Sequence, residues 1–196
     1  MTEKRLLISI IIFFSITTNS LSIEPDVFVQ STVNRASKLL AENIPKDQKI
    51  ERLKLIAKET VDIRGIGFYT LGAKRKSLNI EEKKRYSELF EEYFLKSFSS
   101  RLAEYTNPEI DVQSKEKLNE NYTIVNSILK ATNERPEIKI DWRIYTKNPE
   151  NPLIRDLIIE GLSLARTQKE EFASVLNSNN DDIEALFKVL EEFSKN

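Results

Sequence analysis

The sequence has 196 residues, with 30 Lys and Arg against 31 Asp and Glu, a formal net charge of −1, and neither Cys nor His. This nearly neutral composition argues against a nucleic-acid-binding protein, which needs a concentrated basic surface. The absence of Cys and His excludes disulfides, a Ser-His-Asp triad, a Cys nucleophile and an ordinary zinc site. We therefore expect a protein that is not an enzyme, holds no metal or cofactor, and is stabilised by packing alone.

The first residues have the pattern of an export signal. Lys4 and Arg5 give a positive start, an apolar run continues to Ile16, and small polar residues follow it. The apolar run is much shorter than the roughly 20 residues that span a bilayer, so an uncleaved membrane anchor is the weaker alternative. We predict a signal peptide over residues 1–22 and a single domain over residues 23–196.

Helical periodicity dominates the first half of the predicted domain. Apolar residues recur there at spacings of three and four, as on the buried side of a helix. Asn79 followed by Glu82 predicts a capping box at the start of the longest helix, and Gly72 is expected to end the preceding helix in the left-handed conformation. The predicted helices cover residues 26–43, 48–61, 62–71 and 79–105.

The longest predicted helix carries an aromatic stripe on its inner face. Such a stripe is ordinary core packing in most proteins, but this one is larger than a compact two-layer core requires. Its aromatic members are Tyr86, Phe90, Tyr93, Phe94 and Phe98, and Tyr105 extends it.

From Pro108 onward the apolar period changes from helical spacing to two, which indicates strands. Short turn-like connections between the strands favour an antiparallel meander with one packed face. Two helices follow, the first opened by a second capping-box pattern at Thr167 and Glu170. The predicted fold is therefore α+β, with helices packed on one face of a curved, roughly four-stranded antiparallel sheet. The strands are expected near residues 110–113, 122–129, 138–145 and 153–159, and the closing helices over 167–177 and 181–193.

Three carboxylates, Asp141, Asp156 and Glu160, are the best candidates for acid–base chemistry. Asp156 and Glu160 lie four residues apart, or roughly 13 Å along an extended strand, which is too far for a glycosidase pair. The alternative is a structural role, in which a carboxylate accepts backbone N–H groups where the chain turns at Gly161. We favour that structural role.

A basic tripeptide, Lys74-Arg75-Lys76, follows Gly72. Lys and Arg both bind phosphate, so this segment is a candidate site for a lipid phosphate. A basic triplet between two helices is more commonly a solvated loop, and that alternative stays open.

The remaining signal is apolar: the aromatic stripe faces a strand face that contains the single tryptophan. If the two layers meet without filling the space between them, they enclose an apolar cavity. The residues expected to line it, chosen by facing and apolarity, are Ile66, Tyr69, Tyr86, Phe90, Phe94, Ile124, Ile140, Trp142, Ile144 and Ile159.

One segment of the sequence resembles a known family. The pattern Trp142-Arg143…Asp156-x-x-x-Glu160-Gly161-x-Ser163-Leu164…Thr167-x-Lys169…Phe172, together with Asp62…Leu71-Gly72…Arg85…Phe90 upstream, is similar to the MlaC family of periplasmic phospholipid carriers. The resemblance extends over essentially the whole predicted domain. The chain departs from the family pattern at Pro152, where an aromatic residue is common, and at Arg155, where Tyr is common.

The resemblance implies a periplasmic lipid-carrier domain that shuttles phospholipid between membranes and maintains outer-membrane lipid asymmetry. Its implied partners are a phospholipid ligand, an inner-membrane ABC transporter with an MCE-domain ring, and an outer-membrane lipoprotein and porin complex. A monomer is expected. The alternatives are an interaction module of the cell envelope with a filled core, and an envelope hydrolase that uses the carboxylates.

Overall fold

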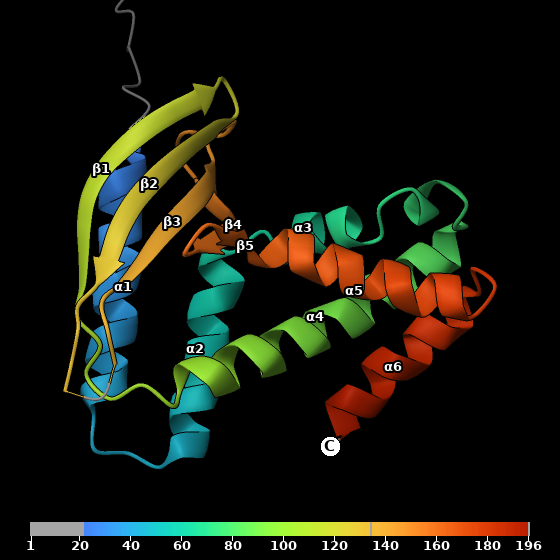
Figure 1. Cartoon of the computed structure of the whole chain (residues 1–196), viewed down its shortest axis with the longest axis horizontal. Helices are drawn as coiled ribbons and strands as arrows, with labels where there is room; N and C mark the ends of the chain where they lie inside the picture. Colours follow the sequence, from blue (N-terminus) through green and yellow to red (C-terminus); the bar gives the residue numbers. More distant parts are fainter. Residues whose placement is uncertain (1–21, 134, 196) are drawn as a thin grey trace, which may run out of the picture.

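The computed structural model describes residues 22–133 and 135–195. They form an α+β fold, with α-helices and one five-stranded antiparallel sheet, which confirms the predicted class. Figure 1 shows the sheet and α1 on one side of the molecule and the group α3 to α6 on the other, with α2 between them. The elements are α1 (Pro25–Ala41), α2 (Lys46–Thr60), α3 (Ile63–Thr70), the 3-10 turn η1 (Lys74–Lys76), α4 (Ile80–Leu102), β1 (Ile110–Asn119), β2 (Tyr122–Leu129), β3 (Ile138–Tyr145), β4 (Leu153–Ile159), β5 (Leu162–Ser163), α5 (Leu164–Ser178) and α6 (Ile183–Lys195).

The sheet is a meander in which consecutive strands are neighbours, in the order β1-β2-β3-β4-β5. The predicted four strands are present, and a two-residue fifth strand pairs with the end of β4. Burial alternates along β2 and β3, with Val125 fully buried opposite Trp142. One face of the sheet is therefore part of the core, as a period-two apolar pattern predicts.

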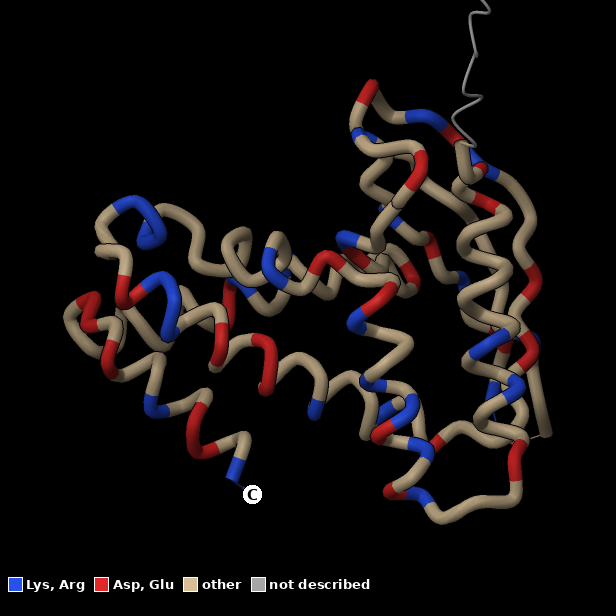
Figure 2. The backbone as a smooth tube through the Cα atoms, turned by 180° about the vertical axis from the view of Figure 1, so that it is seen from behind, with Lys and Arg blue, Asp and Glu red and all other residues tan. Residues whose placement is uncertain are grey.

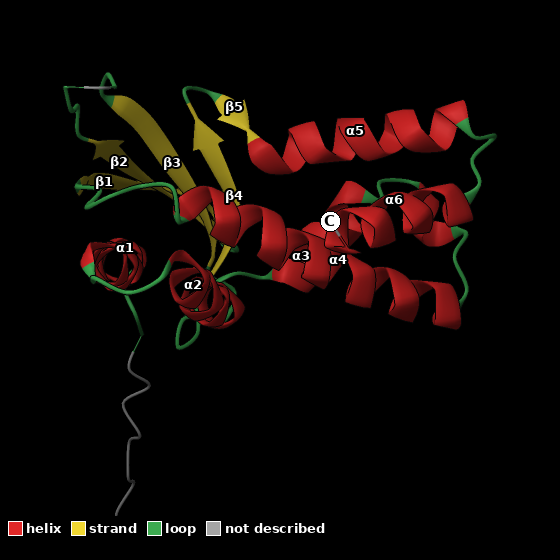
Figure 3. Ribbon diagram, turned by 90° about the horizontal axis from the view of Figure 1, so that it is seen from below, coloured by secondary structure: helices red, strands yellow, loops and turns green. Residues whose placement is uncertain are grey.

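Helix α1 covers part of that buried face beside β1 and β2 (Figures 1 and 3). Val29 and Val33 of α1 belong to the same buried cluster as Val125. At the start of the helix, the Lys115 ammonium of β1 lies 2.5 Å from a Glu24 carboxylate oxygen and 2.7 Å from one of Asp26. Apolar packing and an exposed ion-pair group thus join the first helix to the first strand.

The free side of β4 is covered by the junction between α2 and α3. Val61 forms a parallel bridge with Ile154, and the Asp62 amide donates to the Ile154 carbonyl at 3.0 Å. The Asp62 carboxylate accepts from Gly65 N as the N-cap of α3, and it also pairs with Arg155 of β4. This junction fixes the start of α3 against the sheet.

Arg155 is the centre of a contact group at this junction. Besides Asp62, its guanidinium donates to the Tyr122 hydroxyl at 3.0 Å and lies 4.2 Å from the ring centre of Tyr145. Arginine combines an ion pair with stacking on an aromatic ring. Arg155 therefore connects β2, β3 and β4 to the α2–α3 junction.

Two of the predicted helix boundaries are confirmed and one is wrong. Asn79 and Glu82 form the capping box of α4, and Gly72 has φ +56° after α3. Helix α5, however, begins at Leu164 with Ser163 as its N-cap, so Thr167 lies inside the helix and is not its cap. The first strand also continues to Asn119, well beyond the short strand expected.

Lys and Arg are interspersed with Asp and Glu along the described chain, and the basic turn Lys74–Lys76 is a short run of one sign (Figure 2). Within the described residues, no helix combines the length and apolarity needed to cross a membrane. The predicted signal peptide falls on residues 1–22, of which residues 1–21 lie outside the described part of the chain.

Candidate functional site

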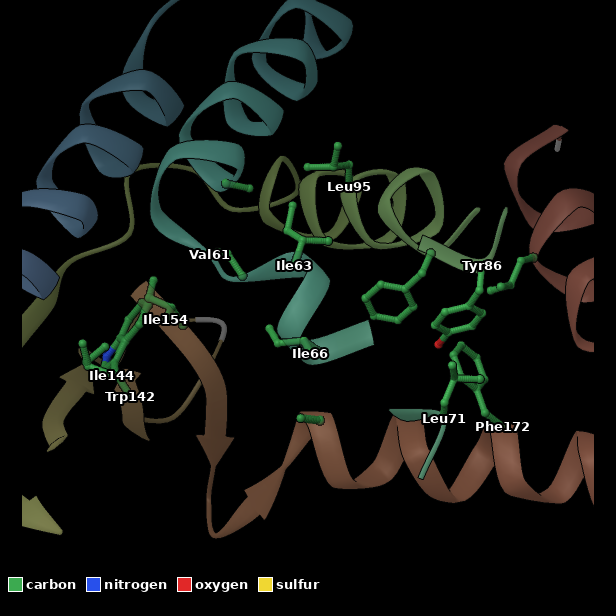
Figure 4. Packing of buried hydrophobic residues seen from close by; sticks show 14 of the residues in the cluster. Val61, Ile63, Ile66, Leu71, Tyr86, Leu95, Trp142, Ile144, Ile154 and Phe172 are labelled. Carbon is green, nitrogen blue, oxygen red and sulfur yellow. The ribbon is translucent and has the colours of Figure 1, made fainter. Parts of the chain in front are cut away.

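A pocket of about 230 Å³ lies where α4, α5 and the sheet meet. Its wall is mainly apolar and it is not closed off from solvent. Figure 4 shows the two ends of the surrounding core, with Trp142 and Ile154 at the sheet and Tyr86 and Phe172 among the helices. The lining residues are Val61, Ile66, Phe90, Tyr93, Phe94, Ser97, Phe98, Arg101, Trp142, Ile154, Asp156, Leu157, Leu164, Ala165, Thr167, Gln168 and Glu171.

Trp142 forms the sheet side of the pocket. It lies at the middle of β3 with Leu157 of β4 beside it in register. Its indole N–H donates to the Ser127 hydroxyl at 2.8 Å, and that hydroxyl donates to the Ile140 carbonyl at 3.0 Å. Because the one polar atom of the indole is satisfied within the sheet, the ring presents an apolar surface to the pocket.

The aromatic stripe of α4 forms the opposite side. Phe90, Phe94 and Phe98 recur every four residues, so they lie in one row along the helix. The rings of Phe94 and Phe98 are stacked, with centres 5.4 Å apart, and those of Phe90 and Phe94 are 6.2 Å apart. Phe90 is buried, whereas Phe94 and Phe98 are only half-buried and line the pocket.

Helices α4 and α5 touch at one end of the pocket. The Tyr93 hydroxyl donates to the Gln168 side-chain oxygen at 2.7 Å, and the Tyr93 ring lies 5.9 Å from that of Phe172. Burial raises the pKa of the Tyr93 hydroxyl, and the Glu171 carboxylate raises it further, while the Gln168 hydrogen bond and the Arg101 charge lower it. The net shift of the pKa is upward, and a tyrosine hydroxyl is protonated at neutral pH even without it, so the Tyr93 hydroxyl is able to donate.

The turn between β4 and α5 is held by Asp156, which is 4% exposed. One carboxylate oxygen accepts from the Ser163 hydroxyl at 2.6 Å and the other accepts from Ala165 N at 3.0 Å. Glu160 and Gly161 form the tip of the turn with φ of +49° and +82°. The structural role predicted for Asp156 is therefore confirmed: it anchors the first turn of α5 and so positions one wall of the pocket.

The other two carboxylates also have structural partners. Glu160 accepts a hydrogen bond from Lys139 N, and Asp141 accepts from the Asn126 amide at 2.8 Å. Among the described residues, no group of three His, Cys, Asp or Glu side chains is arranged to hold a metal ion.

Four of the residues expected to line a cavity do line this pocket, and they come from three separate elements. The other six do not. Tyr86 and Ile144 are fully buried, and the Tyr86 hydroxyl is hydrogen-bonded to that of Thr70 at 2.8 Å. The four lining residues are Ile66, Phe90, Phe94 and Trp142.

The predicted facing is wrong for Ile124 and for Tyr69. Ile124 pairs with Arg143 across β2 and β3, whereas Trp142 pairs with Val125. The Ile124 side chain therefore points to the opposite face of the sheet from Trp142. Tyr69 is 41% exposed and has the Lys169 ammonium 5.2 Å from its ring centre. Ile140 and Ile159 pair with each other on the same sheet face as Trp142, but beyond the pocket.

The α5 wall and the polar rim were missed by the sequence analysis. Leu164 was not assigned because the start of α5 was predicted three residues too late, and Gln168 and Glu171 were not assigned because the lining was chosen by apolarity. Arg101 was overlooked, although it follows Phe98 by three residues and so continues the stripe. The basic tripeptide lies elsewhere: Lys74 binds Asp181, and none of its three residues lines the pocket.

The family model described as MlaC protein matches residues 30–192. The chain belongs to the MlaC family. The matched range includes every residue that lines the pocket. A search of curated proteins gave no match to this MlaC-family sequence.

The fold is similar to that of a phospholipid-binding protein from Ralstonia solanacearum, whose structure was solved in complex with a phospholipid. The TM-score is 0.74 over 88% of this chain and 98% of that one, with 17% sequence identity. At this identity the similarity establishes a shared fold, with helices on an open antiparallel sheet.

Proposed function

We propose that this MlaC-family protein is a periplasmic phospholipid carrier, with the acyl chains held between α4, α5 and the sheet. The observation that carries the proposal is the apolar pocket between Trp142 and the α4 aromatic row, at the junction of the two layers. The Ralstonia neighbour with the same fold was solved with a phospholipid, which supports this ligand class. Asp141, Asp156 and Glu160, the carboxylates considered for acid–base chemistry, are all engaged in structural contacts, which favours binding over catalysis.

The pocket must widen to hold a phospholipid. Its volume of about 230 Å³ is below the roughly 300–1,000 Å³ of pockets that enclose drug-sized ligands. We expect α4 and α5 to separate at their mutual contact, because one hydrogen bond and two ring contacts close that end of the pocket. Separation of these helices would extend the pocket along the aromatic row.

The energetics favour transfer between apolar sites over release into water. Two acyl chains contain about 30 methylenes at about 0.8 kcal/mol each, which sums to more than the practical limit of about 21 kcal/mol on measured affinities. A bilayer is as apolar as the pocket, so exchange between the two can be nearly balanced. The direction of transfer then has to come from partner complexes.

The cellular role that we propose is the one that the MlaC resemblance implies. In this proposal residues 1–22 direct export, residues 23–196 act as a monomeric carrier domain in the periplasm, and the carrier exchanges lipid with two complexes. These are an inner-membrane ABC transporter with an MCE-domain ring and an outer-membrane lipoprotein and porin complex. The result is maintenance of outer-membrane lipid asymmetry.

Lipid extraction tests the proposal. The exported protein is purified without detergent, extracted with organic solvent and analysed by mass spectrometry. Roughly stoichiometric phospholipid is the expected result. A lipid-free protein that also takes up none from vesicles would identify an interaction module with a filled core.

A pair of variants assigns the lipid to this pocket. Phe94→Asp introduces a charge into the half-buried aromatic row and should remove most of the recovered lipid. Leu55→Asp is the matched control, because Leu55 is 60% exposed on α2 and does not line the pocket. Equal lipid recovery from both variants would contradict the assignment. Circular dichroism verifies that both variants remain folded.

A further inference from the structure

The rim of the pocket carries two opposite charges without ionic partners. Arg101 and Glu171 are exposed, and both line the pocket. Arg101 makes no ion pair or side-chain hydrogen bond with the described part of the chain, and Glu171 accepts only the Gln168 amide, at 2.9 Å. Arg85, by contrast, pairs with two carboxylates of α6. The rim charges are therefore available to a ligand.

Arg101 and Glu171 belong to opposite walls of the pocket, and both lie near the Tyr93 hydroxyl. Arg101 is in the last turn of α4 and continues the row of Phe94 and Phe98, whereas Glu171 is on α5, three residues after Gln168. Both act electrostatically on the Tyr93 hydroxyl, Glu171 raising its pKa and Arg101 lowering it. A head group that leaves the apolar pocket at this rim meets a cation from one wall and an anion from the other.

We propose that the pocket selects phospholipids with a zwitterionic head group that ends in a primary ammonium. Arg101 binds the phosphate and Glu171 binds the ammonium. This inference rests on the proposed phospholipid function. A guanidinium matches two phosphate oxygens through parallel N–H bonds, and a carboxylate accepts the N–H groups of an ammonium. The basic tripeptide after Gly72 is not needed, since it lies outside the pocket lining.

The arrangement disfavours anionic head groups. A glycerol head group has no cation for Glu171, so its phosphate binds Arg101 while the Glu171 carboxylate is left without a counter-charge. Because the rim is exposed, each contact is expected to change selectivity only about two- to fivefold. The acyl chains supply most of the affinity, and the rim supplies the preference.

Competition between lipids tests the inference. The protein is incubated with vesicles that contain equal amounts of ethanolamine and glycerol phospholipids with identical acyl chains, re-isolated, extracted and analysed by mass spectrometry. The wild-type protein is expected to be enriched about two- to fivefold in the ethanolamine lipid. Glu171→Gln should lose the enrichment while still carrying lipid, and Glu171→Lys should reverse it towards the glycerol lipid. Arg101→Gln should lower the recovery of both lipids.

Two neighbouring residues provide matched controls. Glu170 and Arg166 are exposed on α5, next to the pocket residues, and neither lines the pocket. Glu170→Gln and Arg166→Gln should keep the wild-type enrichment. An unselective wild-type protein, or an unchanged ratio in Glu171→Lys, would overturn the head-group inference and leave the carrier function standing. A wild-type protein that takes up neither lipid would overturn both.

Discussion

The two halves of the α4 aromatic row differ in what covers them. Tyr86 and Phe90 in the first half are 0% and 1% exposed, and they pack against α3 and α5. Phe94 and Phe98 in the second half are half-buried and face the pocket. The sequence period is the same in both halves. The covering elements, and not the helix itself, decide which aromatic side chains are fully buried in the core and which stay half-buried at the pocket.

The cause of the difference lies in α3 and in the divergence of α5. Gly67 lets α3 approach α4 so closely that a Cβ atom there would lie 2.7 Å from the Phe90 ring. Phe172 closes the same half from α5, with its ring edge-on to that of Phe90. Towards the sheet, α5 and α4 separate (Figure 1) and the pocket occupies that end. Substitutions in each half test whether the two halves of the row differ in their contribution to stability and to lipid binding.

The largest effect is expected from truncating the packed half. Tyr86→Ala should lower the free energy of unfolding by about 3–5 kcal/mol, because it leaves a cavity under α3. Phe94→Ala removes a half-buried ring and should cost only about 1 kcal/mol, while lowering lipid recovery. Urea denaturation of the two variants gives the comparison. Equal losses of stability would show that the halves are both ordinary core.

The next effect concerns the anchor of α5. Asp156→Asn weakens its acceptance of the Ser163 and Ala165 hydrogen bonds in a buried site, and should cost about 2 kcal/mol. The first turn of α5 should then exchange its amide hydrogens faster than α4 does. Hydrogen exchange with mass spectrometry measures this. Unchanged protection at residues 164–168 would contradict the anchoring role.

A smaller effect is expected from closing the space at Gly67. Gly67→Ala forces a Cβ against the buried Phe90 ring, which costs about 1–3 kcal/mol, and the better helix propensity of Ala offsets about 1 kcal/mol of it. A net loss of about 1 kcal/mol in the free energy of unfolding should result. Adding Phe90→Leu should relieve the clash, so the double variant should lose less than the sum of the single ones. Strictly additive losses would show that a clash with the Phe90 ring is not the cause of the destabilisation by Gly67→Ala.

The smallest effect on stability is expected at the α4–α5 contact. Tyr93→Phe removes the hydrogen bond to Gln168 and should cost about 1 kcal/mol or less. Because that contact closes one end of the pocket, lipid exchange with vesicles should nevertheless become faster. Stopped-flow transfer of a fluorescent phospholipid measures the rate. A rate equal to that of the wild-type protein would show that this contact does not restrain opening.

Much of the fold could be predicted from the sequence because its signals are local. The capping box at Asn79 and the period-two pattern around Trp142 each depend on neighbouring residues alone. The start of α5 was misplaced because its N-cap, Ser163, depends on Asp156, which lies in the preceding strand and contacts it only through the turn at Gly161.

The site was harder to predict than the fold because it depends on packing between distant elements. Periodicity identified the stripe of α4 but could not show that Tyr86 is covered by Thr70 of α3 and Phe94 is not. It also could not separate Ile124 from Val125 on β2, since both are apolar and β2 is apolar on both faces. The register with β3 decides between them.

Fluorescence of Trp142 tests the central claim most directly, because it is the only tryptophan in the sequence and it lines the pocket. The protein is loaded with a phospholipid whose acyl chains carry bromine, and its emission is compared with that of protein loaded with the unbrominated lipid. Our account predicts strong quenching by the brominated chains, weakened in Phe94→Asp as lipid is lost. Stoichiometric binding of the brominated lipid without quenching of Trp142 would contradict it.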